Sequence, residues 1–245
     1  VGAGLERALL FGSKARRQAR PDSDLDMLLV FKRLPPDREP QASHAEHIAE
    51  AVAARTGVPL SVWCVSREDL LAGRRTPMLV DALEDAVPLW PADEPPPRAE
   101  LTPADALFCA ARLLDRVQEG SAEVAEKLAA GDPAWARRAR DDLVRLCTAA
   151  LLLAGETRPR RGDAVRRFLE RSPGFNPGAE GCTALAWAAR SYPRGHVEMD
   201  DDSPLPPLPV PADAVLDTAE RLRDWILALG RAARRRGTFV RSPGR

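Results

Sequence analysis

A proline-rich run at residues 91–97 is the sequence feature that most restricts how this chain can fold. Four of its seven residues are proline, which lacks a backbone N–H and has a fixed φ, so the run can sustain neither a helix nor a central strand. Strand-like and helix-like segments alternate before the run, whereas the segments after it show helical periodicity throughout. We therefore predict an α/β domain over residues 1–90, a linker over residues 91–101 and a helical domain over residues 102–245.

The first 90 residues contain short strand-like segments separated by helical ones. This alternation predicts an α/β fold with one mixed sheet flanked by helices. In the helix predicted for residues 41–56, Ile48, Val52 and Ala53 recur at helical spacing and indicate its apolar side. The predicted strands cover residues 7–11, 25–31, 58–65 and 87–90, and two further helices are predicted just after Ser66 and over residues 76–85.

The residues beyond the proline-rich run predict a bundle of about five helices. The predicted helices cover residues 104–130, 134–153, 163–170 and 183–191, and a last one runs from just after Pro211 to Gly230.

A glycine–serine pair and two alternate aspartates form the pattern that indicates chemistry in the first domain. Gly12 and Ser13 follow the first predicted strand, and Asp24 and Asp26 lie at the start of the second. Glycine lets the backbone approach a ligand closely, and the helix start that follows offers unpaired N–H groups to a phosphate. Aspartates two residues apart point to the same face of a strand, and convergent carboxylates suit Mg²⁺ bridged to triphosphate oxygens. The alternative is a polar loop with two solvated aspartates.

The joint spacing of these residues, with Leu10, Phe11, Arg16 and Ser23 around them, resembles the signature of the minimal nucleotidyltransferases. These proteins form a small bacterial branch of the DNA polymerase β-like nucleotidyltransferase superfamily, and they are related to the aminoglycoside nucleotidyltransferases. The resemblance covers most of residues 5–90. It implies an enzyme that transfers a nucleoside monophosphate from an NTP, with ATP expected, to an acceptor hydroxyl. The acceptor stays open among aminoglycoside-like small molecules, RNA and protein.

The resemblance also implies roles for individual residues, with Mg²⁺ as the metal cofactor. The residues that would bind the metal and serve in catalysis are Asp24 and Asp26, and those that would bind the nucleotide are Gly12, Ser13, Lys14 and Arg16. For Lys14 and Arg16 the expected contribution is neutralisation of phosphate charge. A solvated helix face is the alternative for either of these two side chains.

One position departs from the superfamily pattern. A third carboxylate normally stands on the next core strand, and aligning residues 58–63 with that strand puts Ser61 there. A serine cannot act as a carboxylate base at neutral pH. Either the helical domain supplies the base, for which Glu198 and Asp200 in its acidic cluster are candidates, or the chain binds nucleotide without turnover. The second case would make it a non-catalytic, antitoxin-like nucleotide-binding module. The alternative for the acidic cluster is a solvated loop with no role in catalysis.

The helical part resembles the HEPN superfamily, whose members are often paired with minimal nucleotidyltransferases. The matching stretches are residues 104–108, 143–155, 159–163 and 189–193. Ribonuclease members carry an Arg and a His a few residues apart, and Arg190 and His196 give a further alternative of a HEPN ribonuclease. Tyr192 and Pro193 interrupt the helix on which that motif normally lies, so a helix end followed by a loop is favoured. A homodimer through the helical domain is also expected.

The charge balance argues against one class of function. The chain has 36 Lys plus Arg and 36 Asp plus Glu, with a net charge of zero, whereas proteins that coat nucleic acid or anionic membranes carry excess positive charge. We therefore expect no membrane partner and do not favour RNA. No stretch approaches about 18 apolar residues and no signal peptide is evident, which predicts a soluble, cytoplasmic protein. Because the chain begins almost at its first predicted strand, a preceding helix found in relatives is expected to be absent or truncated.

The cysteines and histidines form no recognisable metal motif. The four cysteines are scattered without a CxxC pair, which predicts reduced core residues. His44 and His47 lie three residues apart on a predicted helix and could share a metal. No third ligand lies near them in the sequence, so a solvated helix face is favoured.

Overall fold

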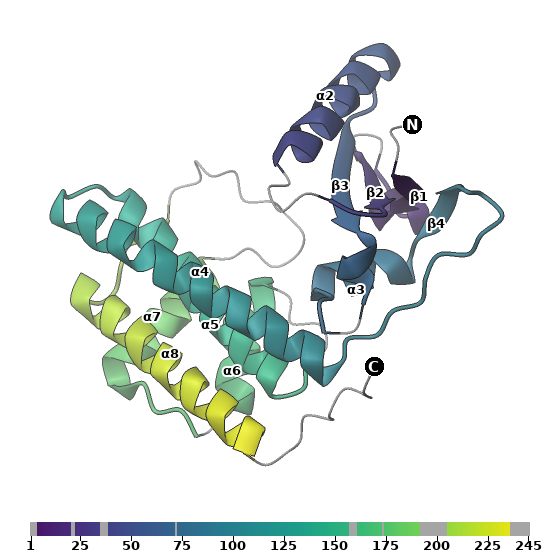
Figure 1. Ribbon diagram of the computed structural model, residues 1–245. Helices are drawn as coiled ribbons and strands as arrows, with labels where there is room; N and C mark the ends of the chain where they lie inside the picture. The colour runs from purple at the N-terminus through teal and green to yellow at the C-terminus, as the bar shows by residue number, and fades with distance from the viewer. Residues whose placement is uncertain are drawn as a thin grey trace. The chain divides into compact units, whose positions relative to one another are not determined.

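The chain forms two compact units, Val1–Thr102 and Pro103–Arg245 (Figure 1). The computed structural model describes residues 4–20, 23–34, 39–71, 73–156, 161–172, 174–191 and 205–235. The first unit is built around a mixed sheet with flanking helices and the second is helical, which confirms the predicted fold class. Residues 91–101, predicted to be a linker, lie within the first unit.

The sheet of the first unit has four strands in the order β3-β2-β1-β4. The strands are β1 (Leu5–Phe11), β2 (Leu25–Phe31), β3 (Leu60–Ser66) and β4 (Val87–Trp90). β2 runs parallel to β3 and antiparallel to β1, and β4 pairs with the other side of β1 in the antiparallel direction. The sheet is therefore mixed, and the C-terminal end of β1 lies beside the N-terminal end of β2.

One face of the sheet packs against α3 (Pro77–Glu84). Alternate residues of the central strands, including Leu9 and Leu28, point to this face and are at most 1 % exposed. Leu79 and Leu83 of α3 cover them and are nearly as well buried. Because apolar burial is the main stabilising contribution in such a layer, this face is the core of the first unit.

The other face of the sheet is covered by α2 (Glu39–Thr56), which packs on β3. The helix turns Ala45 and Ala49 inward, whereas Ile48 is 51 % exposed, so its predicted place on the apolar side is wrong. Alanine has no atoms beyond Cβ, so the buried alanines let the helix backbone approach the strand closely. The larger Ile48 side chain is left on the solvent side.

Local signals in the sequence determine the ends of two short elements. Ser66 accepts a hydrogen bond from the backbone N–H of Asp69, and the Asp69 carboxylate accepts one from the N–H of Ser66. This reciprocal cap begins the 3₁₀ helix η1 (Arg67–Leu70), at the place where a helix after Ser66 was predicted. Thr76 caps α3 in a similar way, by accepting from the N–H of Leu79.

The segment after β4 is attached to the first unit by arginines. The Arg7 side chain donates to the carbonyl of Pro95 over 2.9 Å and forms an ion pair with Glu94 at 2.6 Å. Arg75 donates to the carbonyl of Glu100 over 2.8 Å. These contacts explain why the proline-rich residues belong to the first unit.

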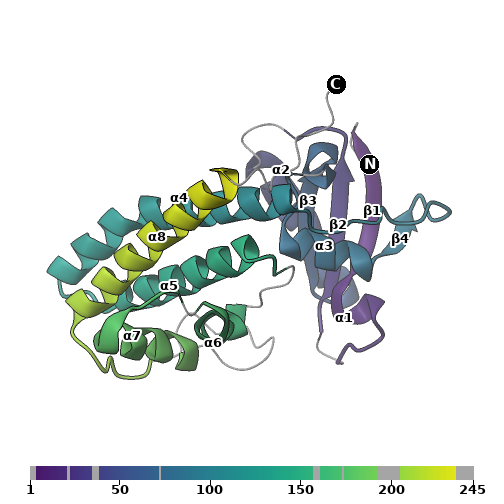
Figure 2. The same ribbon diagram turned by 90° about the horizontal axis from the view of Figure 1, so that it is seen from below.

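The second unit is a bundle in which α5 contacts each of the other four helices (Figure 2). Its described helices are α4 (Pro103–Ala129), α5 (Ala134–Leu153), α6 (Arg161–Arg171), α7 (Gly178–Arg190) and α8 (Ala212–Arg235). Leu143, Leu146 and Leu151 of α5 are completely buried. All five predicted helices are present. However, α7 begins earlier than its sequence pattern indicated, and α8 continues past Gly230 to Arg235.

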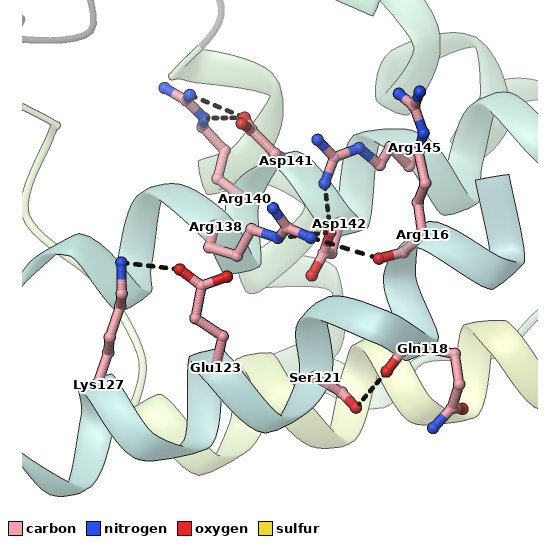
Figure 3. Close-up of polar contacts among 10 residues, drawn as sticks. All are labelled: Arg116, Gln118, Ser121, Glu123, Lys127, Arg138, Arg140, Asp141, Asp142 and Arg145. Carbon is pink, nitrogen blue, oxygen red and sulfur yellow. Dashed lines mark hydrogen bonds and ion pairs between the residues drawn. The ribbon is translucent and has the colours of Figure 1, made fainter. Parts of the chain in front are cut away.

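A charged cluster joins α4 to α5 (Figure 3). The Asp142 side chain is only 6 % exposed and forms ion pairs with Arg145 at 2.6 Å and Arg138 at 3.6 Å. Arg138 also donates to the carbonyl of Arg116 on α4 over 3.3 Å. Its guanidinium lies against Gly120, where an added Cβ would be 2.2 Å from Arg138 Nη2. Burial raises the pKa of the Asp142 carboxyl, although hydrogen bonding from Arg145 opposes that shift.

Candidate functional site

The sheet brings the two halves of the sequence motif together. Phe11, the last residue of β1, is in register with Asp26 of β2. Gly12 and Ser13 follow directly in α1 (Gly12–Ala15), which is a single turn of four residues. Asp24 immediately precedes β2 and is exposed, whereas Asp26 is half-buried. The glycine–serine turn therefore lies at the same end of the sheet as the aspartates.

Gly12 packs directly against the carboxylate of Asp26. Its φ of +74° lies in the left-handed region that residues with a side chain rarely adopt. A Cβ added to it would lie 2.1 Å from Asp26 Oδ2 and 2.9 Å from Asp26 Cγ. The sequence had suggested that this glycine allows a ligand to approach the backbone. The structure shows that the group approaching it is the Asp26 side chain.

The chain after Ser13 folds back through a tight turn. The N–H of Arg16 donates to the carbonyl of Gly12 over 3.2 Å, and that of Gln18 donates to the carbonyl of Ser13 over 2.9 Å. Arg17 has a φ of +58°, which ends the helical turn. The short helix leaves both Ser13 and Lys14 half-buried beside the start of the loop.

Arg16 is held by a residue distant in the sequence. Its Nη1 lies 2.9 Å from Oδ2 of Asp85, the residue at the C-terminal end of α3. Two residues later β4 begins at Val87, which is in register with Leu10 near the end of β1. Asp85 therefore stands beside the same end of the sheet as Gly12, and it is a candidate site residue that sequence reasoning missed.

Ser61 occupies the strand position next to Asp26. The two residues are in register on the parallel strands β3 and β2, and residues in register project from the same face of a sheet. Ser61 is exposed. Among the residues that the structure describes, no group of three or more His, Cys, Asp and Glu side chains could hold a metal ion.

The donor set nevertheless fits one Mg²⁺ that is shared with a nucleotide. Mg²⁺ keeps several waters and is commonly bound by one or two carboxylates together with substrate phosphates, rather than by an all-protein cage. Asp24 and Asp26 supply two carboxylates at an accessible end of the sheet. The packing of Gly12 on Asp26 restricts where the second of these carboxylates can lie.

The remaining candidates lie in other elements or outside the described residues. Arg190 is the last residue of α7 in the second unit and is exposed. His196, Glu198 and Asp200 lie outside the described residues, so the ribonuclease motif and the base from the helical domain stay predictions. His44 and His47 are both exposed on α2.

The cysteines differ in their surroundings. Cys109 and Cys147 are buried core residues as predicted, but Cys182 is exposed on α7, so its predicted place in the core is wrong. Burial, with a smaller contribution from Asp105, raises the pKa of the Cys109 thiol to about 11. Burial also raises the pKa of the Cys147 thiol. Burial first and the nearby Glu46 second raise the pKa of Cys64, which is half-buried beneath α2.

Comparisons with known proteins give a likeness in structure but none in sequence. No protein-family model matches the chain, and no curated protein matches it in sequence. Its structure is similar to the crystal structure of spectinomycin adenyltransferase AAD(9) from Enterococcus faecialis with ATP and spectinomycin. The identity is 15 %, the TM-score is 0.46, and the match covers 91 % of this chain and 92 % of that one. With so low a TM-score, the interpretation of the site rests on this chain's own residues.

None of the helices in the described ranges combines the length and the apolar character that a membrane crossing requires.

Proposed function

We propose that the first unit binds an NTP together with Mg²⁺ and that the protein is a nucleotidyltransferase. The observation that carries this proposal is the packing of Gly12 on the Asp26 carboxylate at the shared end of β1 and β2. A backbone conformation that favours glycine is maintained there, next to a carboxylate on a half-exposed strand end. A solvated polar loop would not require such a close contact. The motif resemblance of residues 10–26 supports the same assignment.

The residues have distinct roles in this proposal. Asp24 and Asp26 hold the metal ion, which when bound neutralises phosphate charge and stabilises the leaving group. The Gly12 backbone and the Ser13 hydroxyl contact the triphosphate. Lys14 and Arg16 lie in the same turn and offset its remaining negative charge. ATP is the expected nucleotide.

The reaction is displacement at the α-phosphorus. The acceptor oxygen forms a new O–P bond, the bond to the β-phosphate oxygen breaks, and pyrophosphate leaves. The acceptor hydroxyl must also lose its proton, and Ser61 beside Asp26 cannot accept it. Glu198 and Asp200 remain the proposed sources of a base. The acceptor class stays open among small molecules, RNA and protein.

A second function is favoured by the position of Ser61. A serine in register with Asp26 leaves the described part of the first unit without a third carboxylate at that place. A non-catalytic module that binds the nucleotide without transferring it would have this arrangement. The two functions differ in one measurable product, because only the transferase releases pyrophosphate when NTP and an acceptor are supplied.

Calorimetric titration with Mg²⁺ and a non-hydrolysable ATP analogue tests the binding site. Asp24→Ala combined with Asp26→Ala should weaken binding at least about 100-fold, because both proposed metal ligands are removed. Asp93→Ala combined with Glu100→Ala is the matched control, since it removes two exposed carboxylates from the segment after β4. Equal binding by the two double variants would contradict the assignment. A pyrophosphate assay with the wild-type protein then separates the enzyme from the binding module.

A further inference from the structure

The ion pair between Arg16 and Asp85 has a consequence for nucleotide binding. We propose that Asp85 is a positioning residue, which holds the Arg16 guanidinium at the edge of the Gly12–Ser13 turn so that it meets the phosphates of the nucleotide. This inference rests on the proposed function, because it assigns a partner to one residue of the same site. The observation behind it is a contact between residues 69 positions apart in the sequence.

Asp85 lies at a rigid place in the first unit. It ends α3, whose Leu79 and Leu83 are at most 3 % exposed and whose first turn is capped by Thr76. Ala86, the next residue, packs against the same apolar core. Val87 then enters the sheet beside β1. Because the chain on both sides is anchored, the Asp85 carboxylate is presented from a well-defined backbone position.

Arg16, in contrast, lies in a short surface turn. It follows the single turn of α1, and its side chain is 38 % exposed. Among the described residues, its guanidinium forms a hydrogen bond and ion pair with Asp85 alone. A long side chain in such a turn would populate many rotamers without that contact. The ion pair selects those that keep the guanidinium near Gly12.

The geometry leaves Arg16 able to bind a second anion. A guanidinium has five N–H donors, and the contact with Asp85 uses Nη1. Nε and Nη2 remain for phosphate oxygens, which arginine binds well in a forked geometry. The guanidinium can thus bridge a fixed carboxylate and a mobile ligand.

Two effects of Asp85 on affinity oppose each other. Its negative charge repels phosphate, which would weaken binding, whereas the restriction of Arg16 rotamers strengthens it. Repulsion through solvent is screened over a Debye length of about 8 Å at physiological ionic strength, and the Asp85 charge is also offset by Arg16 at contact distance. The orientation effect is not screened by salt, so we expect it to be the larger one.

The ion pair between Arg74 and Glu68 provides a matched control. It has the same separation of 2.9 Å and lies in the same unit, but it joins η1 to the turn that follows. Glu68→Gln therefore removes an ion pair of the same length, although a more exposed one, away from the Gly12 turn. Asp85→Asn is the corresponding change at the site.

The decisive experiment is a double-mutant cycle in the calorimetric titration with Mg²⁺ and the ATP analogue. Asp85→Asn should weaken binding about fivefold, and Arg16→Ala at least about tenfold. Adding Asp85→Asn to Arg16→Ala should cause no further loss, because Asp85 acts through Arg16. Asp85→Glu should restore part of the affinity, and Glu68→Gln should bind like the wild type. Thermal unfolding of Asp85→Asn and Glu68→Gln should be alike.

Each contrary outcome is informative. Unchanged or tighter binding by Asp85→Asn would overturn the positioning role while leaving the nucleotide site intact. The positioning role would also be overturned if Asp85→Asn weakened binding as much in the Arg16→Ala variant as in the wild type, since Asp85 would then act on the ligand by another route. A wild-type protein that binds no NTP would overturn both this inference and the proposed function.

Discussion

Replacement of Gly12 by alanine should damage the site through two separable effects. The first is backbone strain, because alanine at a φ of +74° costs roughly 1–2 kcal/mol. Roughly 0.4–1 kcal/mol of this is recovered because the unfolded chain becomes stiffer. The second effect is steric, since the new Cβ would lie 2.1 Å from Asp26 Oδ2. Register between Phe11 and Asp26 prevents the strands from separating, so the carboxylate must rotate away from its preferred position.

The rotation of Asp26 determines the size of the effect. An off-rotamer side chain costs roughly 0.5–1.5 kcal/mol, which with the backbone contribution gives about 2 kcal/mol of lost stability in the first unit. For a unit of this size that corresponds to a fall in its unfolding temperature of about 10 °C. The displaced carboxylate should also weaken binding of Mg²⁺ with the ATP analogue at least about tenfold.

Gly57→Ala isolates the backbone strain, so its comparison with Gly12→Ala gives the steric effect. Gly57 has a φ of +71°, close to that of Gly12, but an added Cβ would meet nothing within 4 Å. Scanning calorimetry and titration of both variants therefore separate backbone strain from the contact with Asp26. Combining Gly12→Ala with Asp26→Ala should lose less stability than the sum of the two single losses, because the clash with the Asp26 carboxylate is then gone. If Gly12→Ala matches Gly57→Ala in stability and the wild type in binding, the contact does not position Asp26 and the reasoning is refuted.

Three further predictions concern other positions. Ser61→Asp adds a carboxylate in register with Asp26, so Mn²⁺ should raise the unfolding temperature of this variant more than that of the wild type or of Ser61→Asn. An equal rise in all three proteins would contradict this geometry. In denaturant unfolding, Gly120→Ala should lower the free energy of unfolding by about 1 kcal/mol, because the new Cβ displaces Arg138 from Asp142. Gly230→Ala, with open space around it, should instead raise that free energy by up to about 1 kcal/mol. Equal gains in the two variants would count against the Arg138 contact. At pH 8 an aromatic disulfide reagent should modify the exposed Cys182 first. Cys109 should react slowly, because it is buried and its raised pKa of about 11 leaves little of its thiol as thiolate. A fast reaction that persists in Cys182→Ser would oppose this prediction.

The strands and helix caps were predictable because their signals are local. β2 (Leu25–Phe31) has the bounds predicted from its apolar run, which lies between a polar loop and a proline pair. Ser66 and Thr76 begin helices through contacts with residues three positions ahead. Such contacts depend on side-chain chemistry within one turn, so a single sequence is enough to predict them.

The contacts that depend on tertiary packing were not predictable in the same way. The sequence contains nothing that pairs Arg16 with Asp85, because their proximity arises only when α3 leads into β4 beside β1. The apolar side of α2 was misjudged because hydrophobicity suggested Ile48, whereas close packing on β3 selects the small Ala45 and Ala49. Periodicity gives the spacing of a helix face, but the partner surface decides which residues occupy it.

The position of Ser61 suggests how binding and proton transfer are divided in the proposed enzyme. Asp24 and Asp26, together with phosphate oxygens and water, would be enough to hold one metal ion, so nucleotide binding does not need a third carboxylate. Deprotonation of the acceptor does need a base, and the side chain next to Asp26 on β3 is a hydroxyl. Ser61→Asp should therefore affect metal affinity more than it affects the rate of transfer, if the base comes from elsewhere in the chain. A large gain in pyrophosphate release in that variant would instead indicate that the wild-type site lacks a base and serves to bind the nucleotide.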